Sequence, residues 1–64
     1  MSPREIAVFS LLPTGATNRE VARELSISER TVKFHVAAIL QKLGVRSRVE
    51  AAIASYVWRG RRER

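Results

Sequence analysis

The sequence has no cysteine, no aspartate and a single histidine. Without cysteine the chain cannot form a disulfide, a thiolate zinc site or a cysteine nucleophile, and His35 alone cannot supply a paired-histidine metal site. The longest apolar run covers residues 36–40, far below the ~20 residues that a membrane span needs. The first residues also lack the apolar stretch of a secretory signal. We therefore expect a cytoplasmic chain with no metal, no cofactor and no membrane partner.

The chain is also short, and its acidic residues are concentrated in the first half. A chain of 64 residues buries about 60% of the surface that it exposes when unfolded, which suffices for one thin core. Residues 1–29 hold three basic and four acidic residues, whereas residues 30–64 hold nine basic and two acidic residues. The net charge of +6 suits a polyanionic partner, and the second half should carry the anion-binding surface.

Helix start and stop signals divide the chain into four predicted helices. Ser2, Thr17 and Ser47 each precede a glutamate by three residues, which is the capping-box pattern. Pro13 and Gly44 are typical of helix ends. The expected helices cover residues 3–12, 18–25, 29–43 and 48–59. No alternating apolar and polar run of strand length occurs, so we predict an all-α fold, a compact four-helix bundle over residues 1–60 with a frayed basic tail at 61–64.

Residues 17–43 have the spacing of a helix-turn-helix unit. The small Ala22 stands where the two helices would cross, and Ile27 and Val32 would fill the angle between them from either side. A generic helical bundle also has short helices and tight turns. The residues on the outward face of the third predicted helix are therefore needed to distinguish a helix-turn-helix unit from a generic helical bundle.

The third predicted helix has two distinct faces at 100° per residue. Its core stripe consists of Val32, Val36, Ile39, Leu40 and Leu43. The opposite face consists of Arg30, Lys33, Phe34, Ala37, Ala38 and Gln41. In a major groove, Lys33 can donate to guanine, Phe34 can contact a thymine methyl group and Ala37 permits close approach. We therefore predict that these three residues contact DNA bases.

A second group of residues is predicted to contact DNA phosphates. It consists of Asn18, Arg19, Ser28, Arg30, Thr31 and Lys42. Ser28 and Thr31 begin the third helix, where free N–H groups and the helix dipole attract anions, and Arg46 and Arg48 extend this basic track. Helix capping alone also explains Ser28. His35 lies at the border of the core stripe with no nucleophile or orienting group beside it, so we expect no enzyme.

The run from Thr17 to Arg48, and above all the stretch I-S-E-R-T-V-K-F-H-V, resembles the LuxR-type helix-turn-helix DNA-binding domain of bacterial transcription regulators. The resemblance extends from Ser2 to about Gly60. It implies a response-regulator output domain that binds double-stranded DNA sequence-specifically and regulates transcription. Family members often carry a longer polar or basic residue where this chain has Ala37, which predicts one fewer base contact. Such domains usually follow a receiver or sensing domain, so the chain is expected to be an excised domain or a stand-alone regulator.

The resemblance also implies pairing through the last helix. One stripe of that helix, predicted to pack on the bundle, consists of Val49, Ala52, Ile53, Tyr56 and Val57. The second stripe, predicted as the dimer interface, consists of Ala51, Ala54, Ser55 and Trp58. Two copies would read half-sites about one DNA turn apart. In the alternative interpretation Trp58 closes the bottom of the core.

A different class of function remains open at this point. The chain could be a helical protein-interaction module that docks through Phe34 and Trp58 as exposed aromatic anchors, with RNA polymerase as one candidate partner. Docking through aromatic residues would depend far less on salt than DNA binding does. Membrane-surface binding is disfavoured, because the basic residues are not gathered opposite a bulky apolar face.

Overall fold

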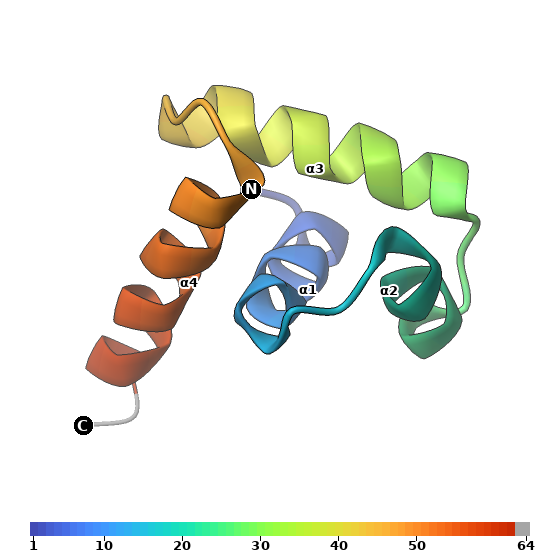
Figure 1. Ribbon diagram of the computed structural model, residues 1–64, viewed down its shortest axis with the longest axis horizontal. Helices are drawn as coiled ribbons and strands as arrows, with labels where there is room; N and C mark the ends of the chain where they lie inside the picture. Colours follow the sequence, from blue (N-terminus) through green and yellow to red (C-terminus); the bar gives the residue numbers. More distant parts are fainter. Residues whose placement is uncertain (63–64) are drawn as a thin grey trace.

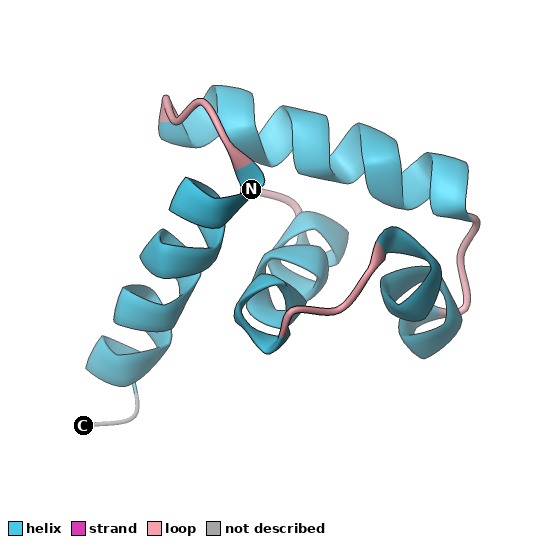
Figure 2. Ribbon diagram, in the orientation of Figure 1, coloured by secondary structure: helices cyan, strands magenta, loops and turns pink. Residues whose placement is uncertain are grey.

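The computed structural model describes residues 1–62. Its elements are α1 (Pro3–Leu11), the short 3-10 helix η1 (Leu12–Thr14), α2 (Asn18–Leu25), α3 (Glu29–Leu43) and α4 (Arg48–Arg62). No strand occurs among these residues (Figure 2), and the predicted all-α fold with four helices is confirmed. Helix α3 runs along one side of the molecule, and α1 and α2 pack against it while α4 packs against α1 and η1 (Figure 1).

Side-chain caps set the helix starts. Ser2, Thr17 and Ser28 are the N-caps of the first three α-helices, and each side-chain oxygen accepts a hydrogen bond from the backbone N–H three residues later. The third predicted capping box, at the start of α4, forms only in part. Ser47 Oγ accepts from the Glu50 N–H, but the Glu50 carboxylate accepts from the N–H of Arg46.

Two helices end a few residues away from their predicted ends. Helix α1 ends at Leu11, and the chain continues through Pro13 as η1, because proline is tolerated in the first turn of a helix, where its missing N–H has no partner to lose. Helix α4 passes through Gly60 and includes Arg62, since a glycine inside a helix costs only about 1 kcal/mol and does not break it. The predicted tail at 61–64 therefore begins inside α4, and residues 63–64 lie outside the described residues.

The core lies between α1, α2 and α3 and is closed by α4. Its buried apolar residues are Val8, Phe9, Leu12, Val21, Ala22, Val32, Val36, Ile39 and Ala51. The predicted core stripe of α3 is confirmed at Val32, Val36 and Ile39. Leu40 is half-buried, and Leu43 is 38% exposed because it lies in the last turn of α3.

Residues 26–28 make the tight turn between α2 and α3. Ser26 adopts a left-handed conformation with φ 57° and ends α2, and the N–H of Ile27 donates to Ala22 O at 3.0 Å. Ala22, which the helix-turn-helix spacing places at the crossing of the two helices, is buried. This turn holds the start of α3 beside α2 and leaves the opposite face of α3 uncovered.

The structure reverses the two predicted faces of α4. Ala51 and Ser55, predicted as dimer contacts, are completely buried, and Ala54 and Trp58 are half-buried against the core. The stripe predicted to pack inside faces outward except at Ala52, which is half-buried against the core. Its exposed members are Val49, Ile53, Tyr56 and Val57.

The end of α1 explains why the small-residue stripe of α4 faces inward. Pro13 has no N–H, and the Phe9 carbonyl accepts instead from the N–H of Leu12, which leaves one oxygen lone pair for a second donor. Ser55 Oγ donates to that carbonyl at 2.7 Å inside the core, and Trp58 packs on the Phe9 ring with the centroids 5.6 Å apart. Serine and alanine allow the close approach that this bond requires. Residue size and a buried carbonyl, rather than hydrophobicity, therefore select the inner face.

Candidate nucleic-acid interface

A hollow lies on the uncovered face of α3, beside the start of α2. It is lined by Asn18, Glu29, Arg30, Lys33, Phe34 and Ala37. All three predicted base contacts and two of the predicted phosphate contacts therefore meet at one place. Residues 30, 33, 34 and 37 share this face because positions three, four and seven apart lie one above another on a helix. Only Asn18 comes from α2.

Phe34 is the most unusual side chain of the hollow. It is 62% exposed, so it does not fold back into the core. The Arg30 guanidinium carbon lies 5.6 Å from the centre of its ring, within the range of a cation–π contact. An exposed apolar ring beside a cation can contact an apolar group and an anion at the same time. The edge of a base pair next to a phosphate offers such groups.

Side chains of Ser28 and Thr31 cap the start of α3. Ser28 Oγ accepts from the Thr31 N–H at 3.0 Å and also contacts Thr31 Oγ1 at 2.8 Å. Each of these two predicted phosphate contacts is therefore the other's hydrogen-bond partner. The remaining N–H groups of the first turn have no partner inside the helix. Arg19 is exposed at the start of α2, beside Asn18.

Lys42, a predicted phosphate contact, does not line the hollow. Its ammonium pairs with Glu5 Oε1 at 2.7 Å, and the Glu5 side chain is only 8% exposed. The pair joins the first turn of α1 to the last turn of α3. The two residues stand 37 positions apart, so no local pattern in the sequence indicates the contact.

The Glu5–Lys42 pair makes stability depend on pH. The Lys42 ammonium, together with the N–H of Ser2, lowers the pKa of Glu5 from 4.5 to about 2. Because this pKa is lower in the folded state, the ionised carboxylate stabilises the fold above pH 4.5, and this contribution is lost as the pH falls toward 2. Thermal unfolding measured across this range should show a falling Tm, and Glu5→Gln should flatten the fall.

A matched variant separates this effect from the general effect of acid. Glu24 is exposed on α2, so Glu24→Gln removes one carboxylate outside the Glu5–Lys42 pair and is the variant with which Glu5→Gln is compared at each pH. Part of the slope should survive in Glu5→Gln, because the hydrogen bonds from Thr17 lower the pKa of Glu20 in the same direction. Equal slopes for Glu5→Gln and the wild type would contradict the assignment.

Within residues 1–62, no group of three or more histidine, glutamate or other ligating side chains is arranged to hold a metal ion. His35 is half-buried, in agreement with its predicted place at the border of the core. No helix in this part of the chain has the length and apolar character needed to cross a membrane.

Two helices joined by a three-residue turn, with the second presenting an uncovered cationic face, define a helix-turn-helix domain. Residues 1–55 match the family described as bacterial regulatory proteins, luxR family. The chain belongs to this family, and the resemblance stated from the sequence is confirmed.

Several characterised proteins are similar to this chain. The nitrate/nitrite response regulator NarL of Escherichia coli K12 is 45% identical over 53 residues, which are 83% of this chain and 24% of NarL. The transcriptional regulatory protein LnrK of Bacillus subtilis is 49% identical over 55 residues, 86% of this chain and 25% of LnrK. The spore germination protein GerE of B. subtilis is 45% identical over 53 residues and is covered to 72% of its length. The chain thus spans about a quarter of the length of NarL and LnrK.

Proposed function

We propose that this domain binds double-stranded DNA sequence-specifically and regulates transcription, with α3 in the major groove. The observation that carries the proposal is the hollow in which Lys33, Phe34 and Ala37 lie together on an uncovered face. Membership of a family of bacterial regulatory proteins supports the same function, as do relatives named as response or transcriptional regulators. The domain acts as a binding module and not as an enzyme.

The dimensions and charge of α3 suit a groove. An α-helix with its side chains is about 10–12 Å across, and the major groove is about 12 Å wide. Lys33 supplies a hydrogen-bond donor for guanine, Phe34 supplies an apolar contact, and the short Ala37 lets the helix axis approach the bases. Nine basic residues against two acidic ones in residues 30–64 attract the phosphate backbone and raise the rate of encounter.

Selection of bound duplexes from a random pool tests the proposal. The selected duplexes should share a motif, and affinity for them should fall steeply between low and moderate salt concentrations. Absence of an enriched motif, together with salt-independent binding, would contradict DNA recognition. Trp58 packs on Phe9, so of the two anchors of the rival protein-docking interpretation only Phe34 is exposed. RNA polymerase stays a candidate partner of the DNA-bound domain.

We further propose that two copies pair on DNA through the outer face of α4. Val49, Ile53, Tyr56 and Val57 are between 51% and 73% exposed, an apolar stripe that water disfavours. Ile53→Ser should reduce affinity for a duplex with two half-sites but not for a duplex with one, and the single half-site is the internal control. Sedimentation should find two wild-type copies on the longer duplex. One copy per palindromic duplex would contradict the pairing.

A further inference from the structure

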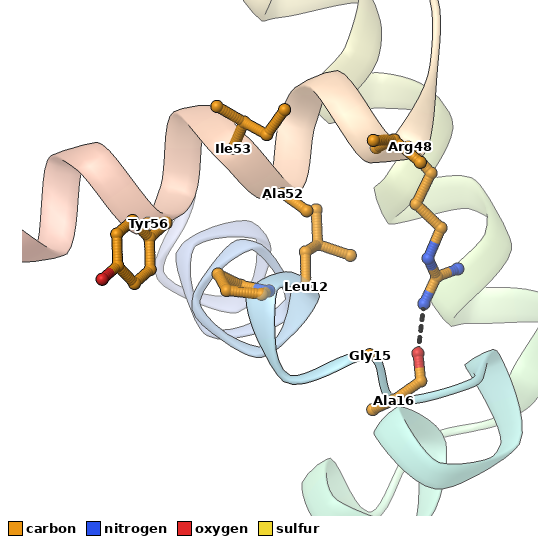
Figure 3. Close-up of a pocket in the computed structure, with 9 residues that line it drawn as sticks. Leu12, Gly15, Ala16, Arg48, Ala52, Ile53 and Tyr56 are labelled. Atoms are coloured by element: carbon orange, nitrogen blue, oxygen red, sulfur yellow. Dashed lines mark hydrogen bonds between the residues drawn. The ribbon is translucent and has the colours of Figure 1, made fainter.

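Arg48 links the start of α4 to the start of α2. It is the first residue of α4, and its half-buried side chain crosses the gap to the segment that leads into α2. Nη2 donates to the Ala16 carbonyl at 2.7 Å, and Nη1 donates to Asn18 Oδ1. Figure 3 shows the Arg48 side chain extending from α4 to Ala16. Both arms of the guanidinium therefore bind the protein itself, although the sequence predicted that Arg48 extends the phosphate track.

The chemistry of the two groups fixes which way the Asn18 amide faces. A guanidinium has only donors, so it can bind the oxygen of the Asn18 amide but not the nitrogen. The amide nitrogen must then face away from Arg48. No hydrogen bond from that nitrogen to another residue occurs within residues 1–62. Asn18 also lines the hollow together with Arg30 and Lys33, so this residue belongs to the proposed DNA-binding surface.

We propose that Arg48 is a positioning residue that orients the Asn18 amide nitrogen to donate to a DNA phosphate, an inference that rests on the proposed function. Without Arg48 the amide can turn over, because its two ends have nearly the same shape. An amide oxygen turned toward a phosphate cannot donate and is repelled by the phosphate oxygens. Arg48 thus contributes to DNA binding through Asn18 and makes no phosphate contact of its own.

A double-mutant cycle on DNA binding tests this assignment. The variants are Arg48→Met, Asn18→Ala and the double variant, and the probe is the duplex selected from a random pool by the wild-type protein. Each single variant should weaken binding by a factor of about 2 to 10, the range for one hydrogen bond. The double variant should be no weaker than the weaker single variant, since both changes remove the same contact. Additive losses would overturn the proposal.

The salt dependence distinguishes a positioning role of Arg48 from a direct contact between Arg48 and a phosphate. An amide carries no charge, so losing its phosphate contact releases no fewer counterions. The slope of log affinity against log salt should therefore be the same for the wild type and Arg48→Met. A slope smaller by about 0.9 would show that Arg48 itself neutralises a phosphate and would overturn the proposal. Arg46→Met is the matched control, because it removes one charge from the exposed neighbouring loop and should add to Asn18→Ala.

Nuclear magnetic resonance keeps the test decisive even where a variant fails to fold. The chain has one asparagine and one glutamine, Asn18 and Gln41, so its ¹⁵N spectrum contains only two side-chain amide pairs. Adding the duplex to the wild-type protein should shift the Asn18 pair, and an unmoved Asn18 pair would overturn the proposal. In the folded Arg48→Met variant without DNA, the Asn18 pair should shift while the Gln41 pair stays. A wild-type protein that binds no duplex would overturn the proposed function itself, and this inference with it.

Discussion

Replacing Ile39 with alanine should lower the free energy of unfolding by about 2–5 kcal/mol, the range for an isoleucine or leucine truncated in a packed core. Ile39 is completely buried and is among the largest fully buried side chains of the domain. It lies on the inner face of α3, which packs against α1 and α2. Small domains have free energies of unfolding near the low end of about 5–15 kcal/mol, so this one change should unfold a measurable fraction of the protein. Urea denaturation followed by circular dichroism measures the effect.

Phe34→Ala is the matched control on the same helix. Phe34 is a larger side chain than Ile39, but it is 62% exposed on the opposite face. Truncating an exposed side chain away from the core changes the free energy of unfolding by no more than about 0.5 kcal/mol. We expect this variant to fold like the wild type and to bind the selected duplex more weakly. A loss of stability comparable to that of Ile39→Ala would place Phe34 in the core and would remove the uncovered face on which DNA recognition depends.

Features set by neighbouring residues could be predicted from the sequence. Capping side chains such as Ser2, Thr17 and Ser28 act over three residues, so they mark helix starts without knowledge of the fold. The two faces of α3 are also set by neighbouring residues, because the helical repeat places Val32 and Ile39 on one side of the helix and Phe34 on the other. The hollow that gathers the predicted base contacts follows directly from these two facts.

Features set by distant residues could not be predicted. Helix α4 has one stripe of mostly large apolar residues and one of mostly small residues, and the small-residue stripe faces the core, where Ser55 Oγ donates to the Phe9 carbonyl. Lys42 has the charge of a phosphate contact, but its position opposite Glu5 depends on how α1 packs against α3. Arg48 likewise finds its partners about thirty residues away, at Ala16 and Asn18. Charge and hydrophobicity identify candidates, but only packing assigns partners.

Lys33→Ala should weaken binding to the selected duplex by roughly 1–3 kcal/mol, the range for one specific contact to a base, and should weaken binding to a scrambled duplex far less. Among the three predicted base contacts only Lys33 carries a hydrogen-bond donor, since Phe34 and Ala37 have apolar side chains. Recognition of the hydrogen-bond donors and acceptors of the bases therefore depends on Lys33 more strongly than it would in a domain with a polar side chain at position 37. Repeating the selection with Lys33→Ala should show a relaxed preference at one base pair in each half-site.

Arg30→Ala is the control that separates base recognition from electrostatic attraction to the phosphate backbone. Arg30 lies about one turn before Lys33 on the same exposed face, and its guanidinium lies over the Phe34 ring. We predict that Arg30 contacts a phosphate, whereas Lys33 contacts a base. Its loss should weaken selected and scrambled duplexes alike and should reduce the log–log salt slope by about 0.9. The two substitutions remove the same charge from neighbouring positions, so only a difference in what the side chains touch can separate their effects. Equal losses on both duplexes for Lys33→Ala would show that Lys33 binds the backbone, and base recognition would then have to come from DNA shape.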